Sequence, residues 1–396
     1  MTEKRPLLEN LMHRRVPQFV GMYVAATWLV IELGDWVTER FNLPTMVTSY
    51  VFVAMLVMLP AVVLFAYNHG APGHDEWTKS ERVVIPLNGA LALLLLYAMG
   101  PLLVVEAATE TVQIADETGT LQEFEVARRG HHKKVIGFFW QNQSGNSNLD
   151  WLSYGLPLML AYDLNRVSPA ITVETPFDSA AIRNELSDNG HPSFVGEPQG
   201  LRLEIGRDNR SAALIIGSFS QRDGTFTINT TVLEAESGQV IAEYSVTGSD
   251  WLTAVDDISA AVLESLEIEP SDNQSNDPIG QHFSDSLEAI EHFTNGHVAL
   301  NVANDYPQGI AELQSAVAID PEFAEANGVL STTHYLNSDL ESARETASQA
   351  LKNSYRLSET SKFVLKANRY IFDGDFDRGT RVIEIWSRVQ PNSTYA

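Results

Sequence analysis

The hydrophobic positions of this chain follow two different patterns. Before residue 106 they form three nearly continuous apolar runs, and after it they are interspersed with polar positions, as in a water-exposed protein. A run of about 20 apolar residues can cross the hydrocarbon core of a bilayer as a helix, and in lipid every backbone group must be satisfied within its own segment. The pattern therefore predicts a membrane domain over residues 1–106 with three transmembrane helices, at 16–41, 46–67 and 84–105.

Lysine and arginine in the short flanking segments predict the orientation of these helices. Four cationic residues precede the first run, and Lys79 and Arg82 lie between the second and the third, whereas residues 42–45 contain none. Cytoplasmic flanks carry the excess of such residues, so the amino terminus is expected in the cytoplasm and residues 106–396 across the membrane. In a bacterium this means an inner-membrane protein whose residues 106–396 are periplasmic.

Two acidic residues, Glu32 and Asp35, lie inside the first predicted span on the same helical face as Trp28. An ionisable side chain within a span is a candidate for a functional role, here as a proton relay or as a contact with a partner. The nearness of both residues to the outer interface favours a simpler interpretation, in which they reach the headgroups beside an aromatic belt of Trp28 and Trp36.

Residues 107–268 mix the strand and helix periods, which predicts an α+β domain with a mixed sheet. The turns Asp223-Gly224 and Ser237-Gly238 join predicted strands, and Pro157 is expected in the first turn of the first helix. The predicted elements are a hairpin at 111–126, strands at 135–140, 170–173, 212–219, 225–233 and 240–246, and helices at 149–164, 179–186, 201–207 and 258–266.

After a polar linker at 269–280, residues 281–396 show a period of 34 residues, which separates Gly309 from Ala343 and Ala316 from Ala350. Small residues at this spacing predict about three tetratricopeptide repeats, an all-α solenoid of stacked antiparallel helices with a concave binding face. The partner-binding positions that we expect on these repeats are Asn301, His334, Tyr335, Asn337 and Arg369. Because no polar capping helix follows residue 391, we expect the array to continue beyond this chain or to be capped by a partner.

Composition excludes several classes of function. The chain has no cysteine, so disulfides, thiolate metal sites and cysteine nucleophiles are impossible. Almost all of the net charge of −25 lies after residue 83, and an acidic protein disfavours nucleic acids and anionic lipids. The phosphate-loop, nucleophile-elbow and His-Glu-x-x-His motifs are absent.

Two stretches contain metal-ligand residues but lack the pattern that a metal site requires. Residues 373–384 imitate a calcium loop but place Arg378 where the sharp turn needs glycine. The loop from His69 to Trp77 has no defined ligand spacing, and a turn followed by a capped helix explains it better. Asp150, Asp163 and Glu174 are carboxylates without a visible catalytic arrangement. We therefore expect no enzyme activity, no cofactor and no metal.

Three segments resemble two known families. Val135-Ile-Gly-Phe-Phe-Trp-Gln-Asn142, with Ser144-Gly145 and the following helix, resembles the TolB amino-terminal-like domain, as do residues 213–238. Ala318-Ile-Asp-Pro-Glu-Phe-Ala-Glu-Ala326 resembles a tetratricopeptide repeat, although Tyr355 replaces its terminal proline and Trp386 a small residue. Together with the spans, these segments resemble a bacterial family of membrane-anchored proteins. The resemblance implies an envelope domain that works through protein contacts and has no known catalytic residues.

These observations predict an inner-membrane-anchored periplasmic scaffold or sensor that binds partner proteins through the tetratricopeptide groove. The alternative is a transmembrane signalling component, in which a ligand in the α+β domain shifts the membrane helices through Glu32 and Asp35. An enzyme within residues 135–268 would require a cluster of buried polar residues with shifted pKa values.

Overall fold

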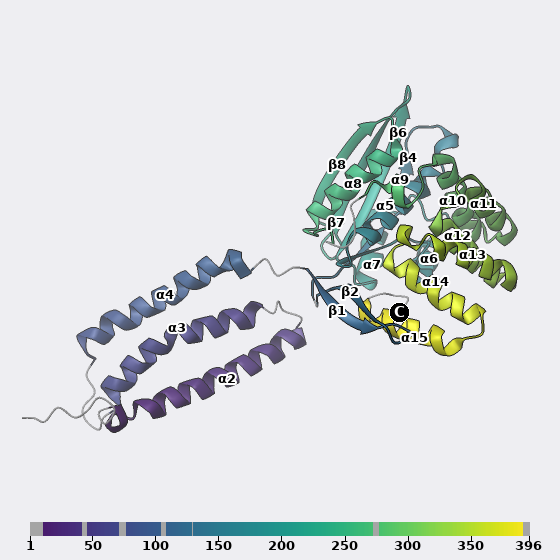
Figure 1. Cartoon of the computed structure of the whole chain (residues 1–396). Coiled ribbons are helices and arrows are strands. Elements are labelled where there is room, and N and C mark those ends of the chain that lie inside the picture. The colour runs from purple at the N-terminus through teal and green to yellow at the C-terminus, as the bar shows by residue number, and fades with distance from the viewer. Residues whose placement is uncertain are drawn as a thin grey trace, which may run out of the picture. The chain divides into compact units, whose positions relative to one another are not determined.

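The computed structural model describes residues 11–41, 46–70, 77–103, 108–128, 130–271 and 277–390. The chain forms two compact units, Met1–Ala107 and Ala108–Ala396 (Figure 1). Each unit is described by itself below.

The first unit consists of the helices α2 (Val16–Phe41), α3 (Met46–His69) and α4 (Lys79–Leu103). Polar side chains join neighbouring helices: the Tyr23 hydroxyl donates to the Met55 carbonyl (2.7 Å), and Asn88 Nδ2 donates to the Val57 carbonyl (3.0 Å). Within the described residues, Val16–Val37 and Thr48–His69 are long and apolar enough to cross a membrane. The sequence predicted a third span at 84–105, and α4 supplies a helix there, but its role as a span stays a prediction.

Helix α4 begins at Lys79, before the apolar run that starts at residue 84, because a capping box forms at Thr78. Glu81 Oε2 accepts from the Thr78 backbone N–H (2.7 Å) and from the Thr78 hydroxyl (2.8 Å). These hydrogen bonds give a partner to a backbone N–H at the start of the helix that has none within it. The other oxygen of Glu81 lies 2.7 Å from His69 Nε2. His69 thus pairs with a cap residue, and the remaining acids and histidine of the suspected metal loop lie outside the described residues.

The second unit is built on a six-stranded mixed sheet in the order β5-β3-β6-β7-β8, with β4 also beside β6. β3 runs parallel to β5 and β6, whereas β6, β7 and β8 form an antiparallel meander. The strands are β3 (Lys133–Gly137), β4 (Gln141–Asn142), β5 (Ile171–Glu174), β6 (Ala213–Arg222), β7 (Thr225–Glu234) and β8 (Val240–Gly248).

Helices cover both faces of this sheet. α5 (Leu152–Val167) and α8 (Trp251–Ser265) share the core that contains Ile215 of β6, and α6 (Ala180–Asp188) and α7 (Gln199–Asp208) share the core that contains its neighbour Leu214. Successive strand residues face opposite sides, so this alternation produces three layers. The predicted α+β fold with a mixed sheet is confirmed, and the hairpin turn at Asp223-Gly224 has the positive φ angles (52° and 80°) that such a turn requires.

Two local predictions were wrong. Pro157 lies inside α5 rather than in its first turn. Because proline has no backbone N–H, the Ser153 carbonyl has no partner within the helix, and it accepts instead from the Trp140 N–H (2.9 Å). The helix predicted to begin at residue 258 begins at Trp251, because the Asp250 side chain accepts from the Leu252 N–H (3.1 Å) and caps it.

Six α-helices in antiparallel pairs follow the short α9 (Ile279–His282) within the described residues. Small residues lie where paired helices approach: a side chain at Gly296 would clash with Leu313, and one at Gly309 with Leu300. The pairs are α10 (Leu287–Val298), continued by η2 (Ala299–Ala303), with α11 (Tyr306–Ile319), α12 (Ala324–Leu336) with α13 (Leu340–Lys352), and α14 (Glu359–Phe372) with α15 (Phe376–Val389). This helical region agrees with the predicted helix pairs, and their identity as tetratricopeptide repeats stays a prediction.

The first helix pair is fixed to the sheet layer by a shared apolar core. Phe293 of α10 is fully buried and contacts Tyr162 of α5, with ring centroids 5.9 Å apart, as well as Phe283 and Phe323. One hydrophobic cluster thereby runs from the sheet into α10, α11 and α12. The two parts that the sequence separates by a linker belong to one compact unit.

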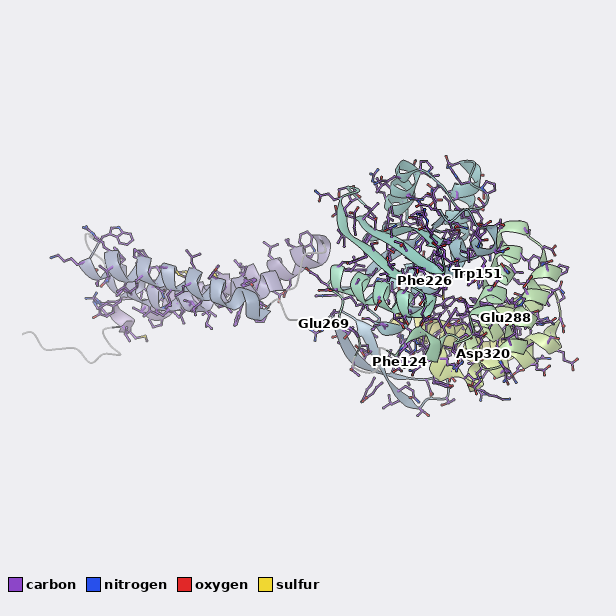
Figure 2. The ribbon with its side chains drawn as sticks, turned by 90° about the horizontal axis from the view of Figure 1, so that it is seen from above. Phe124, Trp151, Phe226, Glu269, Glu288 and Asp320 are labelled. Atoms are coloured by element: carbon purple, nitrogen blue, oxygen red, sulfur yellow. The ribbon has the colours of Figure 1, made fainter. Side chains whose placement is uncertain are left out.

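A hairpin of β1 (Thr109–Ala115) and β2 (Leu121–Ala127) packs on the last helix pair. Val126 is buried in a cluster with Phe363 of α14 and with Ile385 and Trp386 of α15, and Phe124 packs beside Phe363. Figure 2 shows Phe124 on the hairpin beside the C-terminal helices. The hairpin therefore covers the apolar face for which the sequence suggested a partner or a further repeat.

Candidate functional site

A groove of about 1180 Å³ lies in the described part of the second unit. Its walls come from β2 and the turn before it, from the end of α13 and η3 (Ser354–Arg356), and from α14 and α15, with Arg166 and Ser271 at one end. We call it the hairpin groove. Segments from both ends of the unit meet here, so the groove exists only in the folded chain.

The floor of the hairpin groove is apolar and aromatic. The rings of Phe124 and Phe363 lie 5.8 Å apart, and Phe363 stacks on Trp386 at 6.3 Å with nearly parallel planes. The Trp386 indole N–H donates to Gln390 Oε1 at 2.8 Å. Trp386 occupies a position where the repeat pattern expects a small residue, and it fills the space between α14, α15 and the hairpin.

Glu117 fixes the tip of the hairpin to α14. Its buried carboxylate lies 2.8 Å from Lys366 Nζ and accepts from the Tyr370 hydroxyl at 3.1 Å. Burial and this carboxylate both raise the pKa of Tyr370, so the phenol stays a hydrogen-bond donor. A buried acid with two donors from one helix forms a specific contact between the hairpin and α14.

The turn that presents Glu117 is organised by its neighbour Asp116. The Asp116 Oδ1 atom accepts from the Thr118 hydroxyl (2.6 Å), the Thr118 N–H (2.9 Å) and the Thr120 N–H (3.0 Å), and Gly119 supplies the positive φ angle of 90°. These hydrogen bonds, led by the one from the Thr118 hydroxyl, lower the pKa of Asp116 to about 2. Asp116 is therefore ionised at neutral pH.

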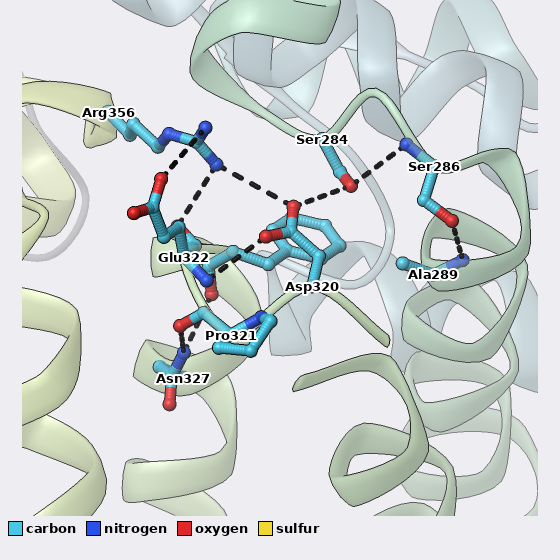
Figure 3. Close-up of polar contacts among 9 residues, drawn as sticks. Ser284, Ser286, Ala289, Asp320, Pro321, Glu322, Asn327 and Arg356 are labelled. Atoms are coloured by element: carbon cyan, nitrogen blue, oxygen red, sulfur yellow. Dashed lines mark hydrogen bonds and ion pairs between the residues drawn. The ribbon is translucent and has the colours of Figure 1, made fainter. Parts of the chain in front are cut away.

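The opposite wall, η3, is held by an ion-pair cluster shown in Figure 3. Arg356 Nη1 lies 3.6 Å from Asp320 Oδ2 and donates to the Glu322 carbonyl (3.2 Å). The Ser284 hydroxyl donates to the same Asp320 oxygen at 2.7 Å, which ties the start of α10 into the cluster. Asp320 thus links the first helix pair to η3, which leads into the last pair and contains Tyr355, whose exposed ring lines the groove.

The cations on α14 are paired with carboxylates. Lys362 lies 2.6 Å from Glu359, and Arg369 Nε lies 2.8 Å from Asp373. Glu123 and Glu125 on β2 differ, because in the described residues Glu123 accepts from the Gln113 amide and Glu125 from the Ser271 hydroxyl, which are uncharged donors. The hairpin side of the groove therefore carries unneutralised negative charge.

Behind α14, the side chain of Glu325 is buried between α12 and α14. Its Oε2 atom accepts from the Ser361 hydroxyl at 3.0 Å. Burial raises the pKa of Glu325 to about 7, and the nearby Asp178 carboxylate adds to this shift. The packing of α14, which forms one side of the groove, is therefore sensitive to pH near neutrality.

The five predicted partner-binding residues have different local environments, and their role in binding stays a prediction. Asn301 donates to the carbonyl of His297 within its own helix, and His334 is largely buried with Nδ1 3.6 Å from Asp339. Tyr335 is half-exposed and stacks on Phe372, and Asn337 is exposed at the end of α12. Arg369 alone among the five lines the hairpin groove.

The candidate coupling residues of the first unit and the three candidate catalytic carboxylates have separate environments. Glu32 and Asp35 are exposed on α2. Asp150 accepts from Asn142 Nδ2 at 2.7 Å, Asp163 lies 3.1 Å from His282 Nε2, and Glu174 lies 3.0 Å from Lys134. The carboxylates serve three different local contacts. The suspected calcium loop has a structural explanation as well, because Asp375 caps α15.

No protein-family model and no curated protein sequence matches the chain. Among solved structures, it is similar to the C-terminal domain of LpoB from Salmonella enterica, with 13% identity and a TM-score of 0.25 over 30% of this chain and 84% of that one. It is also similar to lipoprotein GNA1162 from Neisseria meningitidis, with 11% identity and a TM-score of 0.25 over 34% and 96% of the two chains. The likeness to TolB from Acinetobacter baumannii has 15% identity and a TM-score of 0.24 over 42% and 33%. TM-scores this low assign the chain to none of these families.

The pKa of Glu325 predicts how stability changes with pH. The carboxyl ionises near 4.5 when unfolded and near 7 when folded, so unfolding releases a proton between these values and stability falls as pH rises through them. Glu325→Gln mimics the protonated acid, and we expect it to unfold like wild type at pH 4.5 and to be more stable at pH 8 by up to about 3 kcal/mol. Thermal unfolding of the full-length protein in nanodiscs measures the difference.

Glu345→Gln is the matched control, because Glu345 is exposed on the neighbouring helix α13. It is expected to leave the pH profile unchanged. Equal stability of wild type and Glu325→Gln at every pH would contradict the buried, protonated state of Glu325.

Proposed function

We propose that this chain is a membrane-anchored envelope protein that binds partner proteins through the hairpin groove. The observation that carries this proposal is the groove itself: it is large, it has an aromatic floor, and it lies between helices and a hairpin whose positions are fixed by buried contacts. A volume of about 1180 Å³ exceeds the roughly 300–1,000 Å³ that is usual for small-molecule pockets, so it suits a segment of polypeptide.

The anchor and its direction support an exported location for the groove. The helices α2 and α3 are long and apolar enough to span a bilayer. The distribution of lysine and arginine predicts that α4 is a third span and that residues 106–396 leave the cytoplasm. We therefore place the binding unit in the periplasm of a bacterium, at the outer face of the inner membrane.

Stacked helix pairs support a binding role rather than catalysis. The 34-residue spacing of small residues falls at the contacts between paired helices, as expected for tetratricopeptide repeats, whose known use is the binding of polypeptide segments. The histidines and carboxylates that could have served catalysis are engaged in separate structural pairs, such as His282 with Asp163. We propose accordingly that the protein is not an enzyme.

The groove can be tested with a photo-crosslinking amino acid at Tyr355, whose side chain is 61% exposed and lines the groove. In cells, we expect this position to form a covalent adduct with a discrete envelope protein. Phe376 is the matched control, because it is aromatic, 64% exposed and outside the groove lining. Adducts of equal yield at both positions, or none at residue 355, would contradict the proposal.

Transmembrane signalling is a second candidate, favoured by the connection of the hairpin. The hairpin forms one wall of the groove, and its first strand begins at Thr109, shortly after α4 ends at Leu103. A partner that displaces this wall would act on the chain beside a predicted span. Glu32 and Asp35 are then the residues through which we expect the membrane helices to respond.

A cysteine reporter tests this second function, because the chain has no cysteine of its own. We expect the partner captured at Tyr355 to change the rate of maleimide labelling of Trp77→Cys, an exposed position just before α4 and outside the predicted spans. Adding Glu32→Gln and Asp35→Asn is expected to abolish that change. If the partner leaves the labelling rate unaltered, signalling is contradicted and binding as a scaffold is the function that stands.

A further inference from the structure

The charges that line the hairpin groove are unbalanced in number and in position. Six carboxyl groups and four cationic groups line it. The lysines and arginine of α14 each pair with a carboxylate, and Glu117 is itself neutralised by Lys366. Asp116, Glu123 and Glu125, all on the hairpin, have no cationic partner among the described residues. With Arg166 as the fourth cation, the lining keeps a surplus of two negative charges.

We propose that the hairpin groove binds an extended cationic segment of a partner protein, a proposal that rests on the function inferred above. Glu123 and Glu125 stand two residues apart on one strand, so they share a face at a separation of roughly 7 Å. An extended polypeptide with a lysine or arginine at every second position has the same repeat. Cationic side chains of such a segment can pair with both glutamates, one after the other.

The aromatic residues of the groove fit the same chemistry. A cation within about 6 Å of an aromatic ring is attracted by the negative face of the ring. The chain already makes such contacts beside the groove: the guanidinium of Arg378 lies 5.8 Å from the centre of Tyr370, and that of Arg356 lies 5.9 Å from the centre of Tyr355. The exposed ring of Tyr355 and the ring of Phe124 offer further faces for lysine or arginine.

The charge of the whole chain favours the same partner. With a net charge of −25, the protein attracts cationic segments and repels acidic ones over a Debye length. An acidic segment would also have to displace Glu117 from Lys366 and Tyr370, a buried contact. Both the local and the overall charge therefore select a basic ligand.

The test uses the full-length protein in nanodiscs of zwitterionic lipid and fluorescein-labelled decapeptides, with empty nanodiscs as the blank. One peptide alternates lysine and threonine, a second alternates glutamate and threonine, and a third alternates serine and threonine. We expect the basic peptide to bind at least tenfold more tightly than the other two and to weaken as salt is added.

The Glu123→Gln/Glu125→Gln variant is expected to lose about tenfold in affinity for the basic peptide. The Glu243→Gln/Glu264→Gln variant makes the same change in net charge at exposed sites on β8 and α8, and is expected to lose less than twofold. An equal loss in both variants, or equal binding of acidic or uncharged peptides, would overturn the proposal.

The outcome also separates this inference from the proposed function. If the photo-crosslinker at Tyr355 captures a partner while the basic peptide fails to bind, the groove is a protein site of different chemistry and the inference fails alone. If the peptide fails and residue 355 forms no adduct, both fail.

Discussion

A two-stranded hairpin cannot bury its apolar face by itself and is at best marginally stable in water. The hairpin β1–β2 therefore depends on the helices against which it packs, through Val126 and Phe124 in the cluster with Phe363 and through Glu117 on Lys366. The hairpin stabilises the helices in turn, because it covers apolar residues of α14 and α15. In the described residues, no further helix pair lies over this face. This mutual cover creates the groove.

The position of the last helix pair in turn depends on contacts that begin at the sheet. Phe293 and its aromatic neighbours connect α5 to the first helix pair, and Asp320 connects that pair through Arg356 to the start of the last one. The sheet, the helices and the hairpin form one continuous unit. A ligand in the groove therefore touches segments whose positions are fixed by the whole unit rather than by one repeat.

The sequence predicts those elements whose pattern is local. The apolar run at 16–41 matches α2 residue for residue. The turn at Asp223-Gly224 was predictable because glycine readily adopts the positive φ angle that such a turn requires. Elements that depend on distant partners were less predictable: the sequence predicted a strand from residue 135, whereas β3 already begins at Lys133, because Lys134 pairs with Glu174 of β5.

The groove could not be derived from spacing alone. The hairpin and α14 lie some 250 residues apart, and the contact of Glu117 with Tyr370 spans 253 positions. The repeat pattern pointed to Arg369, which does line the groove, but it placed the other four candidates on η2 and at the end of α12, outside the groove lining. Two signals near the groove were visible in the sequence, namely Trp386 and Tyr355 in positions where the repeat expects other residues. Both lie at or beside the hairpin groove.

The docking of the hairpin on α14 can be measured most directly by hydrogen exchange of the full-length protein. Glu117→Gln removes the charge that Lys366 faces, at a cost of about 2 kcal/mol, which is roughly thirtyfold in an opening equilibrium. We expect the amides of residues 109–127 then to exchange about that much faster, while those of β6 and β7 do not change. Glu110→Gln, on the same hairpin but exposed, is expected to have no effect. Unchanged protection of the hairpin in Glu117→Gln would show that the hairpin is stable without its contact to α14, so the dependence of the hairpin on α14 would be wrong.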